Sequence, residues 1–94
     1  MKLEEFKATL AHEVPPPGLS AAVQALWYVV NNDWDRAHKL VQNQDDGVGA
    51  WVHAHLHRVE GDLRNAGYWY RRADRPEGAE SLEAEWDDIA AAIL

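Results

Sequence analysis

Apolar residues recur along this chain at the three- and four-residue spacing that places side chains on one face of a helix. Leu3, Phe6 and Leu10 follow this spacing near the N-terminus, and residues 82–93 repeat it near the C-terminus. Prolines, glycines and short polar runs interrupt the pattern. The sequence therefore predicts a single all-α domain over residues 1–94, built from antiparallel hairpins of about five to six helices. The predicted helices lie at about 2–13, 20–31, 33–43, 48–60, 62–74 and 80–93.

Polar residues at the predicted helix starts are suited to capping. Ser20, Ser81 and Asp62 each precede an apolar periodic run, and Asn32 or Asp33 caps the third helix. On the helix after Asp62, we expect Leu63, Ala66, Tyr70 and Ala73 to face inward. In the last helix, we expect the acids Glu83, Glu85, Asp87 and Asp88 to face mostly toward solvent, away from the apolar stripe.

Composition and charge exclude several classes of protein. The chain has no cysteine, which excludes disulfides and thiolate metal sites. No apolar run approaches the roughly 20 residues needed to span a bilayer. The first ten residues carry acids where a signal peptide would carry basic and then apolar residues, so we expect a cytoplasmic protein. The chain is acidic, with a net charge of −7, which opposes binding to nucleic acids.

Two segments of the chain resemble each other at a spacing of 29 residues. Asn32–His38 and Gly61–Gly67 both begin with a polar corner and carry an alanine, Ala37 or Ala66, four residues after an aspartate. A small residue twelve positions before Ala66 and an aromatic residue four positions after it add to the pattern. Residues 19–75 therefore resemble a degenerate tetratricopeptide repeat, although the spacing is shorter than the family's 34 residues. The resemblance implies stacked helical hairpins.

The stretch Trp51–Arg72 concentrates chemically useful side chains, with three of the five histidines and two of the five tryptophans. Within and just beyond it, the run Ala54–Ala73, AHLHRVEGDLRNAGYWYRRA, resembles a signature of a group of small uncharacterised bacterial and fungal proteins. The resemblance implies no particular activity, but it implies that this stretch acts as one functional unit.

Two polar strips flank the apolar faces of the two helices predicted in this stretch. The members of each strip lie at i, i+4 and i+7, which places them on one side of a helix. If the hairpin is antiparallel, the strips face each other across a groove for a small polar or anionic ligand. An arginine there can bind a carboxylate or phosphate through two parallel hydrogen bonds, and an indole can form an apolar wall. The candidate ligand-binding residues are His53, His57, Glu60, Asn65, Trp69 and Arg72.

The same strip can also be interpreted as a divalent metal site. His53 and His57, at i and i+4, can chelate an ion with Glu60 as a third ligand, and His38 would complete the site if the hairpins stack. The spacing HxxxH is common by chance, and the glutamate is not placed as in HExxH zinc proteases. A purely structural interpretation also remains open, in which the histidines only pack and Glu60 pairs with Arg64 at i+4.

Two functions follow from these patterns. The architecture favours a small protein–protein interaction module that binds a protein partner or a second copy of itself as a homodimer, because stacked hairpins present a concave face. The alternative is a small-ligand or metal-binding protein that uses the groove of residues 51–72. Whether the protein is an enzyme is left open, and His57 with Glu60 would be its acid–base pair. No resident cofactor is predicted beyond the alternative of a divalent metal.

Overall fold

Six segments of the chain form helices in a computed structural model that describes residues 1–94. The helices are α1 (Leu3–Thr9), α2 (Ala21–Val30), α3 (Trp34–Val41), α4 (Gly47–Val59), α5 (Leu63–Arg72) and α6 (Leu82–Ile93). The predicted all-α fold of about five to six helices is therefore confirmed. None of these helices combines the length and the apolar character needed to cross a membrane.

Short polar side chains start five of the six helices. Ser20, Asp33, Asp62 and Ser81 each accept a hydrogen bond from the backbone N–H three residues ahead, as the sequence predicts. Asp46 does the same for α4. Each such cap stabilises its helix by about 1 kcal/mol, because it pairs a donor that has no partner inside the helix.

The two repeated corners have the same backbone construction. Asn32 (φ 62°) and Gly61 (φ 87°) adopt the left-handed conformation that ends α2 and α4. The next residue, Asp33 or Asp62, donates its N–H to the carbonyl five residues back and accepts a hydrogen bond that starts the following helix. Each corner therefore joins a helix end directly to a helix start, which explains the internal repeat.

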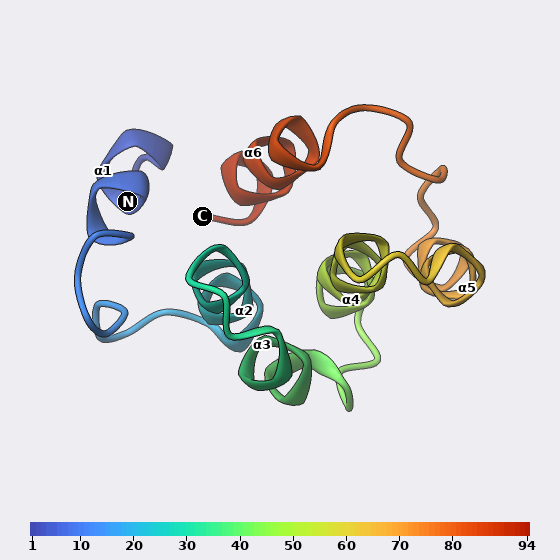
Figure 1. Cartoon of the computed structure of the whole chain (residues 1–94), viewed down its shortest axis with the longest axis horizontal. Helices are drawn as coiled ribbons and strands as arrows, with labels where there is room; N and C mark the ends of the chain where they lie inside the picture. Colours follow the sequence, from blue (N-terminus) through green and yellow to red (C-terminus); the bar gives the residue numbers. More distant parts are fainter.

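Helices α2, α4 and α6 contact one another and form the centre of the molecule (Figure 1). Helix α3 packs against α2 and α4, whereas α5 packs on α4 and α1 packs on α6, at opposite sides of the centre (Figure 1). The core between the central helices and α1 contains large side chains that are fully buried. They include Phe6, Leu26, Trp27, Leu56 and Ile89.

Helix α5 is held by a smaller core of its own, formed by Ala54, Ala66 and Tyr70. The inward positions of Ala66 and Tyr70 are confirmed. The prediction for Leu63 is wrong, because its side chain is 68% exposed. Helix α5 packs along its length against α4 and reaches α6 only through the Tyr70 hydroxyl, so one narrow face of it is covered and Leu63 lies outside that face.

The first helix is shorter than the predicted range 2–13, because it ends at Thr9. The N–H of Leu10 bonds to the carbonyl of Lys7 in a tighter turn, and the Thr9 carbonyl accepts a hydrogen bond from Trp27 Nε1 at 3.2 Å. The indole therefore fixes the end of α1 against α2. The other boundaries lie within two residues of the predicted ones.

A buried polar network crosses the centre, and it corrects the prediction that Glu85 faces solvent. Glu85 is 3% exposed. Its carboxylate accepts hydrogen bonds from His55 Nδ1, at 2.6 Å, and from the Tyr70 hydroxyl, and it lies 3.3 Å from Arg58 Nη1. Burial and the bond to Glu85 raise the pKa of Tyr70, which keeps its hydroxyl a donor. The network ties α4, α5 and α6 together.

Candidate metal centre

Three imidazoles meet where α3 packs against α4. His53 and His57 lie one turn apart on α4, and His38 approaches them from α3. One ligand nitrogen from each of the three residues can be chosen so that all lie within 4.8 Å of one another. His38 Nε2 is 3.0 Å from His53 Nε2, so the two rings share a hydrogen bond when no ion lies between them. Two nitrogens bound to one tetrahedral zinc ion at 2.0–2.1 Å would stand ~3.3 Å apart, so this spacing is close to that of a metal site.

Trp34 positions His38 beside α4. The Trp34 indole Nε1 donates a hydrogen bond to the Leu56 carbonyl at 2.7 Å, which fixes the first turn of α3 against α4. His38 lies one turn further along α3, and its ring stacks on the indole with centroids 4.8 Å apart and planes 10° apart. The position of the third imidazole is therefore set by an aromatic stack and by one helix-to-helix hydrogen bond.

A second indole covers the cluster from the side of α5. The Trp69 ring stacks on His53 with centroids 3.8 Å apart and planes 16° apart. The two α4 imidazoles also stack on each other, with the centroids of His53 and His57 separated by 4.8 Å. Trp34 and Trp69 thus bracket the three histidines, and they limit the directions in which the rings can move.

Burial favours neutral imidazoles in the cluster. Burial, followed by the neighbouring His57 and His38 rings, lowers the pKa of His53 to about 3. Burial and the His57 ring also lower the pKa of His38. Neutral imidazole is the form that binds a metal ion, so the environment prepares two ligands for coordination at neutral pH.

The cluster is a costly arrangement for a purely structural role. His53 is 3% exposed, and its Nδ1 has no hydrogen-bond partner. Leaving a buried polar atom unpaired costs about 1–3 kcal/mol. Protonation of His53 or His38 would also be resisted, because burial and the neighbouring imidazoles lower the pKa of both rings. This cost favours the interpretation that the cluster performs a function.

Glu60 is a hydrogen-bond partner of His57 and is not one of the three candidate metal ligands of the imidazole cluster. Glu60 Oε1 lies 3.3 Å from His57 Nδ1, so the carboxylate can hold the proton on that nitrogen and leave Nε2 free for a metal ion. The predicted ion pair between Glu60 and Arg64 is not formed, because Glu60 pairs with His57 instead. A second grouping of His57, Glu60 and Asp62 also has metal-ligand spacing, but the Asp62 side chain already caps α5.

The structure brings four of the six predicted groove residues together: His53, His57, Glu60 and Trp69. Since Trp69 lies directly on His53, the two polar strips touch at this level of the hairpin.

The other two predicted residues lie further out. Arg72 reaches the cluster only through Trp69, with its guanidinium 5.3 Å from the indole centroid, and it donates hydrogen bonds to Asp45 at 2.8 Å and to the Tyr68 hydroxyl at 3.1 Å. Asn65 is exposed in the first turn of α5. Sequence reasoning missed Trp34 as a residue that positions the site. The sequence places Trp34 four residues before His38, a spacing that stacks the two rings on one helix face, but Trp34 was assigned only to the apolar face of its helix.

Comparisons of the chain with known protein families, with curated proteins and with solved structures find no match. The fold and the site together define a small all-α protein with a three-histidine cluster between two helices. The functional conclusion therefore rests on the geometry of that cluster.

Proposed function

We propose that this protein binds one divalent transition-metal ion through His38, His53 and His57. The observation that supports the proposal is the meeting of three imidazole nitrogens within 4.8 Å of one another. An all-imidazole ligand set suits Zn²⁺, Cu²⁺ or Ni²⁺, whereas Mg²⁺ and Ca²⁺ prefer oxygen ligands. Zn²⁺ is the ion we use to test the site.

Three protein ligands leave one position of a tetrahedral ion for water or a substrate. Zinc sites with four protein ligands are structural, whereas those with three histidines and an open position are catalytic. The proposed centre belongs to the second type. A bound ion would supply an activated water, and Glu60 would orient His57 through its Nδ1.

The protein-interaction module and the tetratricopeptide resemblance remain predictions. They are supported by the packing of α2 with α3 and of α4 with α5 into hairpins. Proteins with many unrelated functions contain such hairpins, so the arrangement does not favour one function. The metal proposal is preferred because it rests on specific nitrogens at specific distances.

Isothermal titration of untagged, metal-free protein with Zn²⁺ tests the proposal. We expect one ion per chain for the wild type, and binding at least roughly a hundredfold weaker for His38→Ala and His57→Ala. Changing a residue that is hydrogen-bonded to a metal ligand weakens binding by about 10–100-fold, and we expect an effect of that size for Glu60→Gln. Removing a ligand itself should weaken Zn²⁺ binding more than that. His12→Ala is the matched control, because His12 is exposed and outside the cluster.

Saturating Zn²⁺ should also raise the melting temperature of the wild type. At a free ion concentration of 100 Kd, binding adds about 2.7 kcal/mol to the free energy of unfolding. Failure of the wild type to bind Zn²⁺, Cu²⁺ or Ni²⁺ would contradict the proposal. Equal binding by the wild type and by both cluster variants would contradict it as well.

A further inference from the structure

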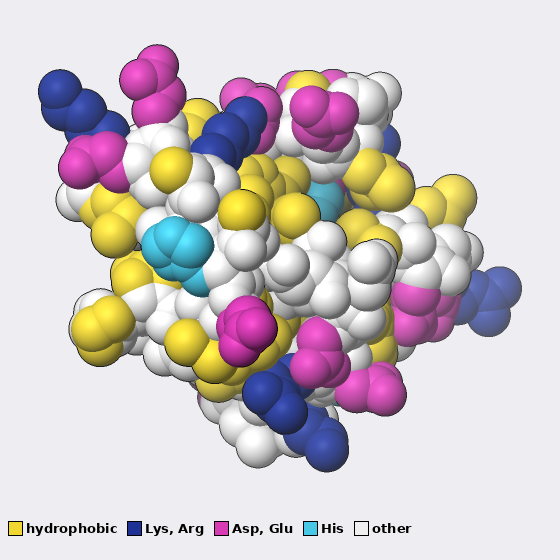
Figure 2. Space-filling view, turned by 60° about the vertical axis from the view of Figure 1, so that its left-hand side comes forward, with side chains coloured by type: hydrophobic (Ala, Val, Ile, Leu, Met, Phe, Trp, Pro, Cys, Tyr) yellow, Lys and Arg dark blue, Asp and Glu magenta, His cyan; other side chains and the backbone are white.

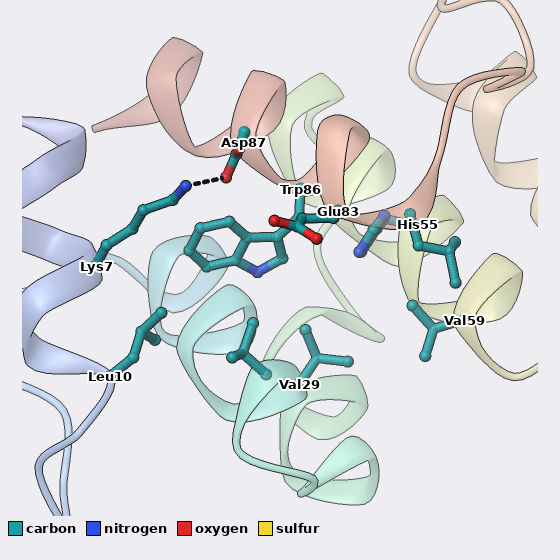
Figure 3. Close-up of a pocket in the computed structure, with 10 residues that line it drawn as sticks. Lys7, Leu10, Val29, His55, Val59, Glu83, Trp86 and Asp87 are labelled. Carbon is teal, nitrogen blue, oxygen red and sulfur yellow. Dashed lines mark ion pairs between the residues drawn. The ribbon is translucent and has the colours of Figure 1, made fainter.

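A cavity of about 430 Å³ lies between α1, α2, α4 and α6 (Figure 3). Ten residues line it, and six of them are hydrophobic. The apolar walls include Leu10 at the end of α1, Val29 on α2, Val59 on α4 and Trp86 on α6. The Trp86 indole Nε1 donates to the Leu26 carbonyl at 2.9 Å, so its ring is fixed and offers the cavity only an apolar face. This volume is at the lower end of the range of small-molecule sites.

Partly exposed apolar side chains surround the cavity. Val30, Val59 and Leu82 are 45%, 37% and 40% exposed, and all three line it. Figure 2 shows hydrophobic side chains reaching the surface between charged ones on the face that it presents. A small molecule could therefore enter without opening the core.

The charges at the cavity disfavour an anionic ligand. Lys7 is the only lysine or arginine that lines it, and its Nζ forms an ion pair with Asp87 Oδ1 at 2.8 Å (Figure 3). Glu83 adds a further carboxylate. No unpaired cation is therefore present to hold a carboxylate or phosphate. A charged ammonium group would also lose its hydration in the apolar interior, which is costly. An uncharged ligand fits this environment better than either ion.

His55 supplies one polar contact point in these walls. It lies two residues from both His53 and His57, and two residues turn a helix by about 200°, so His55 points away from the metal cluster. In Figure 3 its ring lies between Trp86 and Val59. Its Nδ1 is bonded to Glu85 at 2.6 Å, which leaves Nε2 as the nitrogen available to a molecule in the cavity.

We infer that this cavity binds an uncharged small molecule with an apolar body and one hydroxyl group, and that the hydroxyl pairs with His55 Nε2. A hydroxyl both donates and accepts hydrogen bonds, so it satisfies Nε2 whether the imidazole is neutral or protonated. The apolar body replaces water against Val29, Val59 and Trp86. This site is independent of the proposed metal centre, because it uses the other side of α4.

A titration followed by two-dimensional ¹H–¹⁵N NMR tests the inference, with chelator present so that bound metal has no influence. The probes are 4-methylphenol and toluene, which differ by one hydroxyl group. We expect saturable shifts of the Val59 and Leu82 amides and of the Trp86 indole N–H with 4-methylphenol. Toluene should bind about tenfold more weakly, because one hydrogen bond of about 1.4 kcal/mol corresponds to a factor of ten.

Two tryptophan substitutions separate the cavity from general surface binding. Val59→Trp places an indole at the mouth of the cavity from a partly exposed position and should abolish binding of 4-methylphenol. Val48→Trp is the matched control, because Val48 lies on the same helix, is 44% exposed and does not line this cavity. The control should bind like the wild type.

His55→Asn tests the hydrogen bond itself. The asparagine amide can keep the bond to Glu85 but places nothing at the position of Nε2, so 4-methylphenol should bind no more tightly than toluene. Absence of saturable shifts in the wild type would overturn the inference. It would also be overturned if Val59→Trp bound as tightly as Val48→Trp, or if toluene bound the wild type as tightly as 4-methylphenol. The two valine variants decide the outcome even if His55→Asn does not fold.

Discussion

Replacing the buried Glu85 with glutamine is expected to destabilise the fold strongly. The carboxylate accepts from His55 and Tyr70 and faces Arg58, so glutamine keeps the shape but removes the charge. Hydrogen bonds to charged groups contribute about 1.5–3 kcal/mol each, against about 0.5–1.5 kcal/mol for neutral ones. The amide NH₂ would also face a donor. Together these losses amount to about 3 kcal/mol, a large part of the 5–15 kcal/mol typical of a domain.

Urea unfolding followed by tryptophan fluorescence measures this loss. With a slope of about 1.5 kcal/mol/M, the midpoint should fall by about 2 M. Glu83→Gln is the matched control, two residues earlier on α6 and exposed, and its midpoint should be almost unchanged. A midpoint for Glu85→Gln within about 0.3 M of the wild type would refute the argument that this carboxylate holds α4, α5 and α6 together.

The pH dependence of the same variant is a second test. Burial raises the pKa of Glu85, but the hydrogen bonds from His55 and Tyr70 and the charge of Arg58 outweigh it, so the pKa is lowered from its ordinary value of 4.5. The unfolded chain therefore binds a proton more readily than the folded one. The contribution of Glu85 to the free energy of unfolding is fully present above pH 4.5, and it declines as the pH falls toward the lower pKa of the folded state. The wild type should lose this stability in acid, and Glu85→Gln should not.

Three further predictions concern the metal-free protein. Because the folded state holds the pKa of His53 at about 3, the unfolded chain takes up the proton first. In urea unfolding with chelator present, the free energy of unfolding should fall by about 2 kcal/mol as the pH is lowered from about 7.5 to about 5. The His53→Gln variant should lack this decrease. Gly78→Ala should lower stability by about 1–3 kcal/mol in thermal denaturation. Its Cβ would collide with the Glu85 carboxylate and stand 2.8 Å from the Tyr70 hydroxyl, whereas Gly47→Ala, with 3.8 Å to its nearest neighbour, should be tolerated. Asp62→Ala should cost about 1 kcal/mol, measured by the urea midpoint, because it removes the N-cap of α5.

Local patterns in the sequence were sufficient to predict the helices and part of the site. A helix start depends on a capping side chain and on the residues just after it, so Ser20, Asp62 and Ser81 could be identified without tertiary information. His53 and His57 share a face because they lie at i and i+4 on one helix. Their proximity follows from helix geometry alone.

The remaining parts of the site depend on packing between helices. His38 was predicted to join the cluster only if the hairpins stacked, and its position is set by the Trp34 hydrogen bond to α4. Glu85 lies three residues after Leu82 and four before Ile89, so helix geometry places it on the apolar stripe. Glu85 was nevertheless predicted to face solvent, because its side chain is charged. Its partners, His55 and Tyr70, lie on other helices and could not be assigned from local pattern.

The most direct test of the proposed metal centre is X-ray absorption at the zinc edge of protein loaded with one equivalent of Zn²⁺. We expect three imidazole nitrogens at about 2.0–2.1 Å and one further light ligand. In His38→Ala the number of imidazole ligands should fall by one. A first shell made of oxygens alone, or an unchanged number of imidazoles in His38→Ala, would contradict the assignment of His38, His53 and His57 as the metal ligands.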